Sequence, residues 1–139
     1  MACHTKSSLT ALACALLAAA CASVQGVRSQ PLDAGDVRFY AAPFGDVVAA
    51  TRATVLALDI HVQDTATVDS TTWMVLGTKG MSFTSYGEVV RVIVHQTADG
   101  PIAVRVVSKR RLATNIIARN WTDSIFERLD AILHPQPQS

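Results

Sequence analysis

The fold is decided by one stretch of sequence, Val89-Val90-Arg91-Val92-Ile93-Val94-His95-Gln96, and by its continuation Ile102-Ala103-Val104-Arg105-Val106-Val107-Ser108. Side chains alternate between the two faces of a strand, so matching the apolar positions fixes the pairing. The antiparallel register puts four valines on one face, with Val92 opposite Val106 and Val94 opposite Val104. It leaves the short loop Ala98-Asp99-Gly100, whose last position suits a glycine in the left-handed conformation. The stretch therefore predicts an antiparallel hairpin.

The other face of this hairpin is more polar. It carries two arginines and a histidine, and we expect it to be at least half exposed to water. These side chains, together with one isoleucine, are Arg91, Ile93, His95 and Arg105.

Two helices are predicted on either side of the strands. Apolar residues recur at helical spacing from Phe44 to Leu58, after Pro43 in a position that suits the start of a helix. A second apolar stripe runs from about Trp121 to Leu133, and Asn120 is placed to cap this helix.

The remaining strands are expected at Val37–Tyr40, Ile60–Asp64 and Thr71–Leu76, with Met81–Tyr86 as a further edge strand. The element order is β-α-β-β-(β)-β-β-α. Strands grouped in the middle of the chain and joined by short turns indicate an α+β fold. We expect an antiparallel β-sheet of about four to five strands with two helices packed on one face.

Composition limits the class of protein. The chain has 139 residues, 12 Lys and Arg, 11 Asp and Glu, and 50% hydrophobic residues. This length allows one small domain, and the hydrophobic fraction is too high for a disordered chain. A net charge of +1 does not fit the strongly basic surface of nucleic-acid-binding domains. We therefore expect no nucleic-acid partner.

Residues 1–20 have the pattern of an export signal. Lys6 precedes the uncharged stretch Leu9–Ala20. This stretch is shorter than the roughly 20 residues that a helix needs to cross a bilayer. A short positive segment followed by an apolar one is typical of a signal peptide.

The end of this segment, Leu16-Leu17-Ala18-Ala19-Ala20-Cys21, resembles the lipobox of bacterial lipoproteins, although Ala18 stands where leucine is usual. The resemblance implies a lipid on Cys21. Ala22 after the cysteine implies the outer membrane, at its periplasmic face. The triplet Ala20-Cys21-Ala22 also fits an A-x-A cleavage site, which would release a soluble periplasmic protein.

The cysteines favour lipidation. The chain has three cysteines, and Cys3 and Cys14 would leave with the signal. The remaining Cys21 would have no disulfide partner, and acylation would explain it. Beyond it we expect a flexible tether over 21–36, a single α+β domain over 37–134, and a frayed tail over 135–139.

The chain resembles a family of small, largely uncharacterised bacterial envelope lipoproteins. The likeness lies in the lipobox, in Tyr40-Ala41-Ala42-Pro43, and in Ile125-Phe126-x-x-Leu129 of the last helix. Tyr86–Val92 and Ser108–Leu112 also carry it. The resemblance implies an anchored α+β domain with no established activity, so no catalytic residue is carried over.

No catalytic or metal-binding pattern is legible. His61, His95 and His134 fall on separate predicted elements, without the converging ligands that a metal site needs. The serines lack the local signature of a hydrolytic nucleophile. We therefore expect no enzyme activity, no metal and no cofactor.

Lys109, Arg110 and Arg111 form the densest charge in the chain. They are expected either to be a solvated rim or to contact an anionic partner, such as lipid headgroups or an acidic face of an envelope protein. The predicted function is a membrane-anchored, non-enzymatic accessory or scaffold protein that binds another envelope component. The alternative is a periplasmic small-ligand-binding module, with an apolar pocket between helices and sheet lined by Trp73, Met74 and Phe83.

Overall fold

The computed structural model describes residues 23–80, 87–111 and 120–134. Five antiparallel strands form one sheet in the order β1-β5-β4-β3-β2. They are β1 (Asp36–Tyr40), β2 (His61–Asp69), β3 (Thr72–Lys79), β4 (Glu88–Gln96) and β5 (Ile102–Arg110). The predicted α+β class with an antiparallel sheet is confirmed.

The central hairpin has the predicted register. Val92 pairs with Val106 and Val94 with Val104. The Thr97 N–H donates to the Pro101 carbonyl at 3.3 Å and closes the turn, in which Gly100 has a φ of 110°. Only glycine adopts this backbone conformation without strain, so the turn and the face matching support the same pairing.

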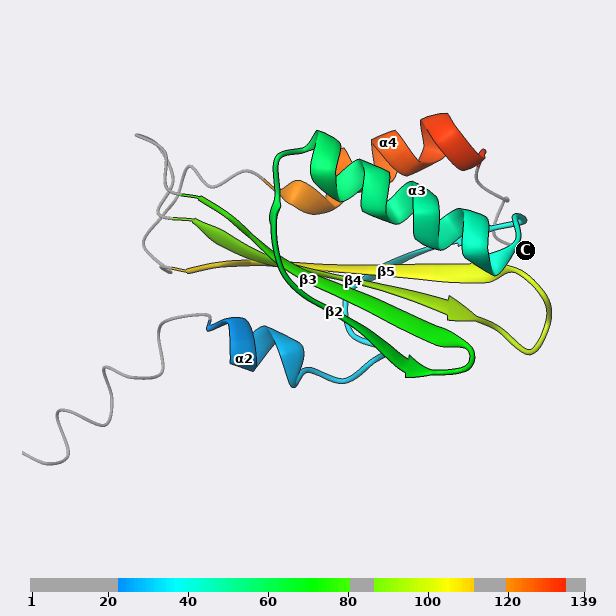
Figure 1. Ribbon diagram of the computed structural model, residues 1–139, viewed down its shortest axis with the longest axis horizontal. Helices are drawn as coiled ribbons and strands as arrows, with labels where there is room; N and C mark the ends of the chain where they lie inside the picture. The colour runs from blue at the N-terminus through cyan, green and yellow to red at the C-terminus, as the bar shows by residue number, and fades with distance from the viewer. Residues whose placement is uncertain (1–22, 81–86, 112–119, 135–139) are drawn as a thin grey trace, which may run out of the picture.

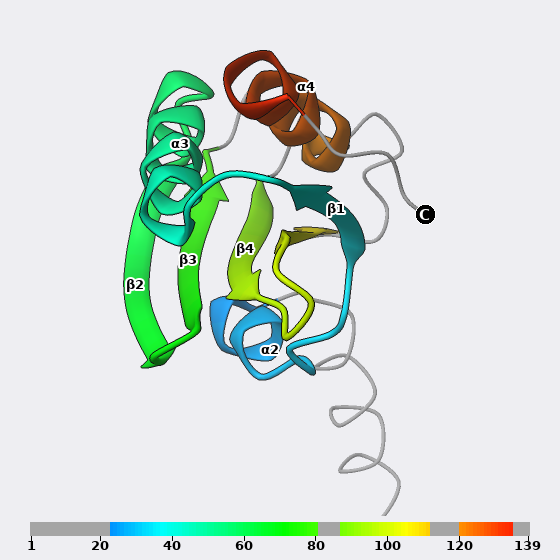
Figure 2. The ribbon, with the colours of Figure 1, turned by 90° about the vertical axis from the view of Figure 1, so that its right-hand side faces the viewer.

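Two helices, α3 (Phe44–Ala57) and α4 (Trp121–Leu133), lie side by side on one face of the sheet (Figures 1 and 2). The Thr122 N–H donates to the Asn120 side-chain oxygen at 3.0 Å, so Asn120 caps α4 as expected. Both predicted helices and their shared face are confirmed.

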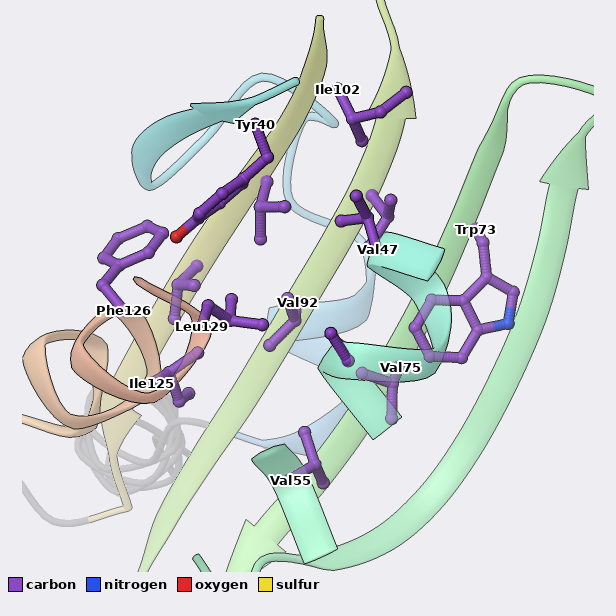
Figure 3. Close-up of a cluster of buried hydrophobic side chains, with 14 of the residues drawn as sticks. Tyr40, Val47, Val55, Trp73, Val75, Val92, Ile102, Ile125, Phe126 and Leu129 are labelled. Carbon is purple, nitrogen blue, oxygen red and sulfur yellow. The ribbon is translucent and has the colours of Figure 1, made fainter. Parts of the chain in front are cut away.

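The main core fills the space between these helices and the sheet (Figure 3). Each element contributes side chains at its own period, two along the strands and about 3.6 along the helices. The core includes Tyr40, Val47, Val55, Trp73, Val75, Val92, Ile102, Ile125, Phe126 and Leu129.

A third helix, α2 (Val24–Arg28), covers the other face of the sheet (Figure 1). Val27 is only 2% exposed and packs with Leu76, Val89 and Val107. The expectation of a flexible tether over 21–36 is therefore corrected for the part that the structure describes. The segment is small and polar in composition, and only its few apolar side chains dock it.

Arg91 fastens this segment to the sheet. Its guanidinium donates to the carbonyl oxygens of Arg28, Gln30 and Pro31 at 3.4, 2.7 and 2.8 Å. Arg91 is 1% exposed, and burial lowers the pKa of its guanidinium. Arginine nevertheless stays protonated in proteins. The partial negative charge of these backbone carbonyl oxygens stabilises the guanidinium through its two terminal nitrogens, while its Nε is buried without a hydrogen-bond partner among the described residues.

The expectation of a half-exposed second face holds for His95, which is exposed, and for Arg105, which is half-buried, but it is wrong for Arg91 and Ile93. Arg91 and Ile93 are each 1% exposed. The chain that follows α2 accepts hydrogen bonds from Arg91, and its residues Leu32 and Asp33 line one groove together with Ile93. A strand covered on both faces reads as a nearly continuous apolar run, which is what β4 shows. Because Arg91 interrupts this apolar run, the sequence of β4 resembled the alternation of apolar and polar residues in a half-exposed strand.

Gly35 allows the segment after α2 to run close to β5. Its φ is 100°, and a Cβ atom there would lie 2.3 Å from the Val106 carbonyl oxygen. Any side chain would push this segment off the sheet.

Several predicted features fall outside the described residues. These are the signal segment 1–20, the lipidation site Cys21, the edge strand at Met81–Tyr86 and the tail 135–139.

Replacing Arg91 with methionine should destabilise the domain. The carbonyl groups of Gln30 and Pro31 would lose their buried donor, at a cost of about 1–3 kcal/mol in the free energy of unfolding. Urea denaturation measures this loss, and amide hydrogen exchange over α2 should increase. The control is Arg105→Gln, which removes a single bond to the Asp33 carbonyl and should change stability by less than about 0.5 kcal/mol. Equal losses in both variants would contradict this role of Arg91.

Candidate functional site

The three adjacent cations lie at the end of β5. Lys109 and Arg110 are its last residues, Arg111 follows, and all three are exposed. Lys109 pairs with Val89 and Arg110 with Glu88, so their side chains leave opposite faces of the sheet. The structure thus brings the cations to one end of the sheet without gathering them on one face.

Lys79 and Glu88 lie at the same end of the sheet as the three cations, and their contacts stabilise the fold. The Lys79 ammonium donates to the carbonyl oxygens of Leu58 and Asp59 at 2.7 and 3.1 Å, where α3 ends. It also lies 5.1 Å from the centre of the Trp121 ring. Glu88 is 2% exposed and accepts from the Trp121 indole N–H at 3.3 Å. These contacts join the sheet to α3 and α4.

A groove of about 610 Å³ opens beside Lys109. It lies between the segment after α2, the end of β5 and the start of α4. Lys109 and Arg110 contribute positive charge to its lining, and Asp36 contributes an acid. Such a groove can receive a hydrated anionic group next to Lys109. Its lining residues are Gln30, Pro31, Ala34, Gly35, Asp36, Val106, Val107, Ser108, Lys109, Arg110, Asn120 and Thr122.

No protein-family model matches this chain, and no curated protein is significantly similar to it. Within the described part of the chain, no three His, Cys, Asp or Glu side chains come together as a metal site. His61 begins β2, His95 lies on β4, and His134 follows α4. None of the described helices is long and apolar enough to span a membrane.

Thr72 and His95 form a polar pair that was not predicted from the sequence. The Thr72 hydroxyl lies 2.8 Å from His95 Nδ1, and the two residues are directly opposite on β3 and β4. Extending the predicted hairpin pairing to the preceding strand would have found them. The pair borders a groove of about 340 Å³ that Asp69 also lines.

This pair does not complete a hydrolytic triad. The Asp69 carboxylate accepts from the N–H and hydroxyl of Thr71, both at 2.8 Å, and these bonds lower its pKa. A triad needs the carboxylate on one ring nitrogen and the nucleophile on the other. Here Asp69 is engaged with Thr71 instead of orienting His95.

The apolar pocket of the alternative prediction would lie where the core is. Trp73 is 5% exposed and belongs to the packed layer between helices and sheet. Met74 follows it in β3 and leaves the opposite face of the sheet. Phe83 falls outside the described residues. In the part that the structure describes, these side chains do not surround a common cavity.

One charged cluster joins the edge strand β1 to α4. The Tyr40 hydroxyl donates to one oxygen of Asp130 at 2.8 Å, and Arg38 bonds the other oxygen. Arg38 also lies over the Phe126 ring, 4.7 Å from its centre. Burial, and then the contact with Asp130, raise the pKa of Tyr40 well above its usual value. Residues about 90 apart in sequence make this cluster, and no local pattern predicts it.

Tyr40→Phe should lower the free energy of unfolding by about 0.5–1.5 kcal/mol at neutral pH, because a hydrogen bond to Asp130 is lost. Above pH 10, the usual tyrosine pKa, the unfolded chain releases the phenolic proton while the folded chain retains it. Tyr40 therefore stabilises the fold fully below pH 10 and progressively less above it. Urea denaturation of both proteins across this range should show their difference shrinking at alkaline pH. A constant difference would refute the raised pKa.

Proposed function

We propose that this chain is a lipoprotein of the bacterial envelope, anchored through Cys21 at the periplasmic face of the outer membrane. It acts without catalysis, as an accessory or scaffold protein that binds another envelope component. The observation that carries the binding role is the long, exposed edge strand β2.

β2 offers an unpaired strand edge. It is nine residues long, it is last in the sheet order, and its only strand partner among the described residues is β3. All its side chains are exposed or half-buried. An edge of this kind is a template for strand addition, in which an extended segment of another protein continues the sheet.

An apolar groove runs beside this edge. Its volume is about 200 Å³, and its lining includes Arg52, Leu56, Val62 and Thr65. Leu56 is 69% exposed and Val62 is 36% exposed. A partner strand with apolar residues at alternate positions would lay them against Leu56 and Val62, since alternate side chains leave the same face. This favours an extended apolar segment as the occupant.

Two irregularities limit the usable edge. The pairing of β2 with β3 shifts between Val62 and Asp64, and again between Thr67 and Asp69. Bulges of this kind twist an edge and discourage indiscriminate pairing. The regular segment Asp64–Thr67 is therefore where we expect a partner strand to pair.

Intact mass spectrometry of the protein from its native envelope fraction tests the anchor. We expect a chain that begins at Cys21 and carries the mass of acyl groups. Cys21→Ala should lack this mass and leave the membrane fraction. An unmodified chain that begins near Ser23 would overturn the anchor and leave a soluble periplasmic protein.

Site-specific photo-crosslinking in the native envelope tests the strand edge. A crosslinker at Val68 should give one discrete product, and Val62→Lys should reduce it several-fold, because a charged edge opposes strand addition. A crosslinker at Ile132 is the matched control, since Ile132 is 50% exposed and Val68 44% exposed. Equal products from both positions, or no effect of Val62→Lys, would contradict the edge as the binding surface.

A further inference from the structure

The folded domain starts immediately after the proposed anchor. α2 begins at Val24, capped by Ser23, whose hydroxyl accepts from the Gly26 N–H at 2.9 Å. Cys21 precedes Val24 by three residues, which reach at most about 11 Å even when fully extended. A lipid on Cys21 would therefore keep the start of α2 within about one Debye length of the headgroups, which is roughly 8–10 Å at physiological salt.

Docking of α2 is what makes this distance short. A flexible tether of the 15 residues from 22 to 36 would have an average reach of roughly 20 Å and would let the domain tumble. Instead, Val27 is buried against the sheet and Arg91 bonds the carbonyl groups of Gln30 and Pro31, just after the helix. Anchor and sheet are then linked through an ordered helix, so the anchor orients the domain.

The start of α2 lies at the basic end of the sheet. Val24 packs on the cluster that contains Val89 and Val107. Lys109 is the strand partner of Val89 and follows Val107 by two residues, on the same face of β5. In Figure 1 the first turn of α2 and the last residues of β5 point to the same end of the molecule. The turn between β4 and β5 is at the opposite end.

We propose that the domain stands end-on against an anionic lipid surface, with Lys109 and Arg111 beside the headgroup phosphates. The inference rests on the proposed lipid anchor and adds an orientation and a lipid class to it. Both cations are exposed, and each cation near an anionic surface strengthens binding about fivefold. The strands then run away from the bilayer, and the Ala98–Gly100 turn is farthest from it. This orientation leaves the edge of β2 accessible to an envelope partner.

Energy transfer from tryptophan to a labelled headgroup tests the orientation. The chain has two tryptophans. Trp121 lies at the basic end, in contact with Lys79, and Trp73 lies six residues before Lys79 on β3, roughly 20 Å away. The lipidated protein is added to preformed vesicles of phosphatidylcholine and phosphatidylglycerol that contain dansyl-phosphatidylethanolamine. Trp73→Phe and Trp121→Phe leave one donor each.

We expect several-fold more transfer from Trp121 than from Trp73. In vesicles of phosphatidylcholine alone, the difference in energy transfer between Trp121 and Trp73 should become smaller, because the anionic charge that holds the basic end is absent. Arg91→Met should also narrow it by releasing α2. Equal transfer from both donors, or more from Trp73, would overturn the end-on orientation.

A second experiment isolates the charges without the anchor. Sedimentation with the same vesicles uses the unlipidated chain from Ala22, which lacks both the apolar stretch Leu9–Ala20 and Cys21. It compares two variants of this chain, Lys109→Gln/Arg111→Gln and Arg52→Gln/Arg128→Gln. Both lose two exposed cations, but the second pair lies on α3 and α4. The first should weaken binding to anionic vesicles about 25-fold, and the second less than twofold. Equal effects, or unchanged binding that is insensitive to salt, would overturn the headgroup contact.

The two proposals fail in different ways. An acylated chain that shows equal transfer from both tryptophans leaves the lipoprotein function standing and removes the orientation. A chain without acyl mass removes the anchor, and the orientation that depends on it, whatever the sedimentation shows. Specific binding of the basic end to an acidic protein, with no binding to the vesicles, would assign Lys109 and Arg111 to a protein partner and overturn the lipid contact.

Discussion

The guanidinium of Arg91 is the contact on which the second face of the sheet depends. An arginine enclosed at 1% exposure needs hydrogen-bond acceptors, and the backbone carbonyl groups of Arg28, Gln30 and Pro31 provide them for its two terminal nitrogens. Leaving such a donor unpaired would cost more than its bonds contribute, so the helix and the arginine require each other. With α2 in place, Val27, Leu76, Val89 and Val107 form a second, smaller core.

The two layers of this domain differ in how they are held. On one face, α3 and α4 pack through a broad apolar core that resists local change. On the other, a five-residue helix is held by a few apolar side chains and one arginine. Isolated helices this short are unstable in water, so tertiary contacts alone maintain α2. Thus α2, the ordered segment nearest the proposed anchor, is held by its contacts with the sheet and not by its own helix propensity.

Part of the site could be read from the sequence. The basic triplet Lys109–Arg111 is visible as adjacent letters, and its place at a strand end followed from the predicted hairpin. The separation of Lys109 and Arg110 onto opposite faces follows from strand alternation, but the groove beside them does not, because residues 30–36 and the start of α4 form its other walls. The clusters of Tyr40 with Asp130 and of Thr72 with His95 also required knowledge of which elements meet.

The sequence by itself determined the hairpin, both large helices and the antiparallel class of the sheet. These follow from local periods, from a turn residue such as Gly100, and from the short connections between the strands. It could not determine that α2 exists or that both faces of β4 are buried from Glu88 to Val94. A short polar segment has no periodic signal, and an arginine on a strand reads as a solvent-facing residue. Only the tertiary structure shows that carbonyl groups some 60 residues earlier in the chain accept hydrogen bonds from the two terminal nitrogens of Arg91. Burial of a charge depends on partners that are close in space, and a local sequence pattern does not record them.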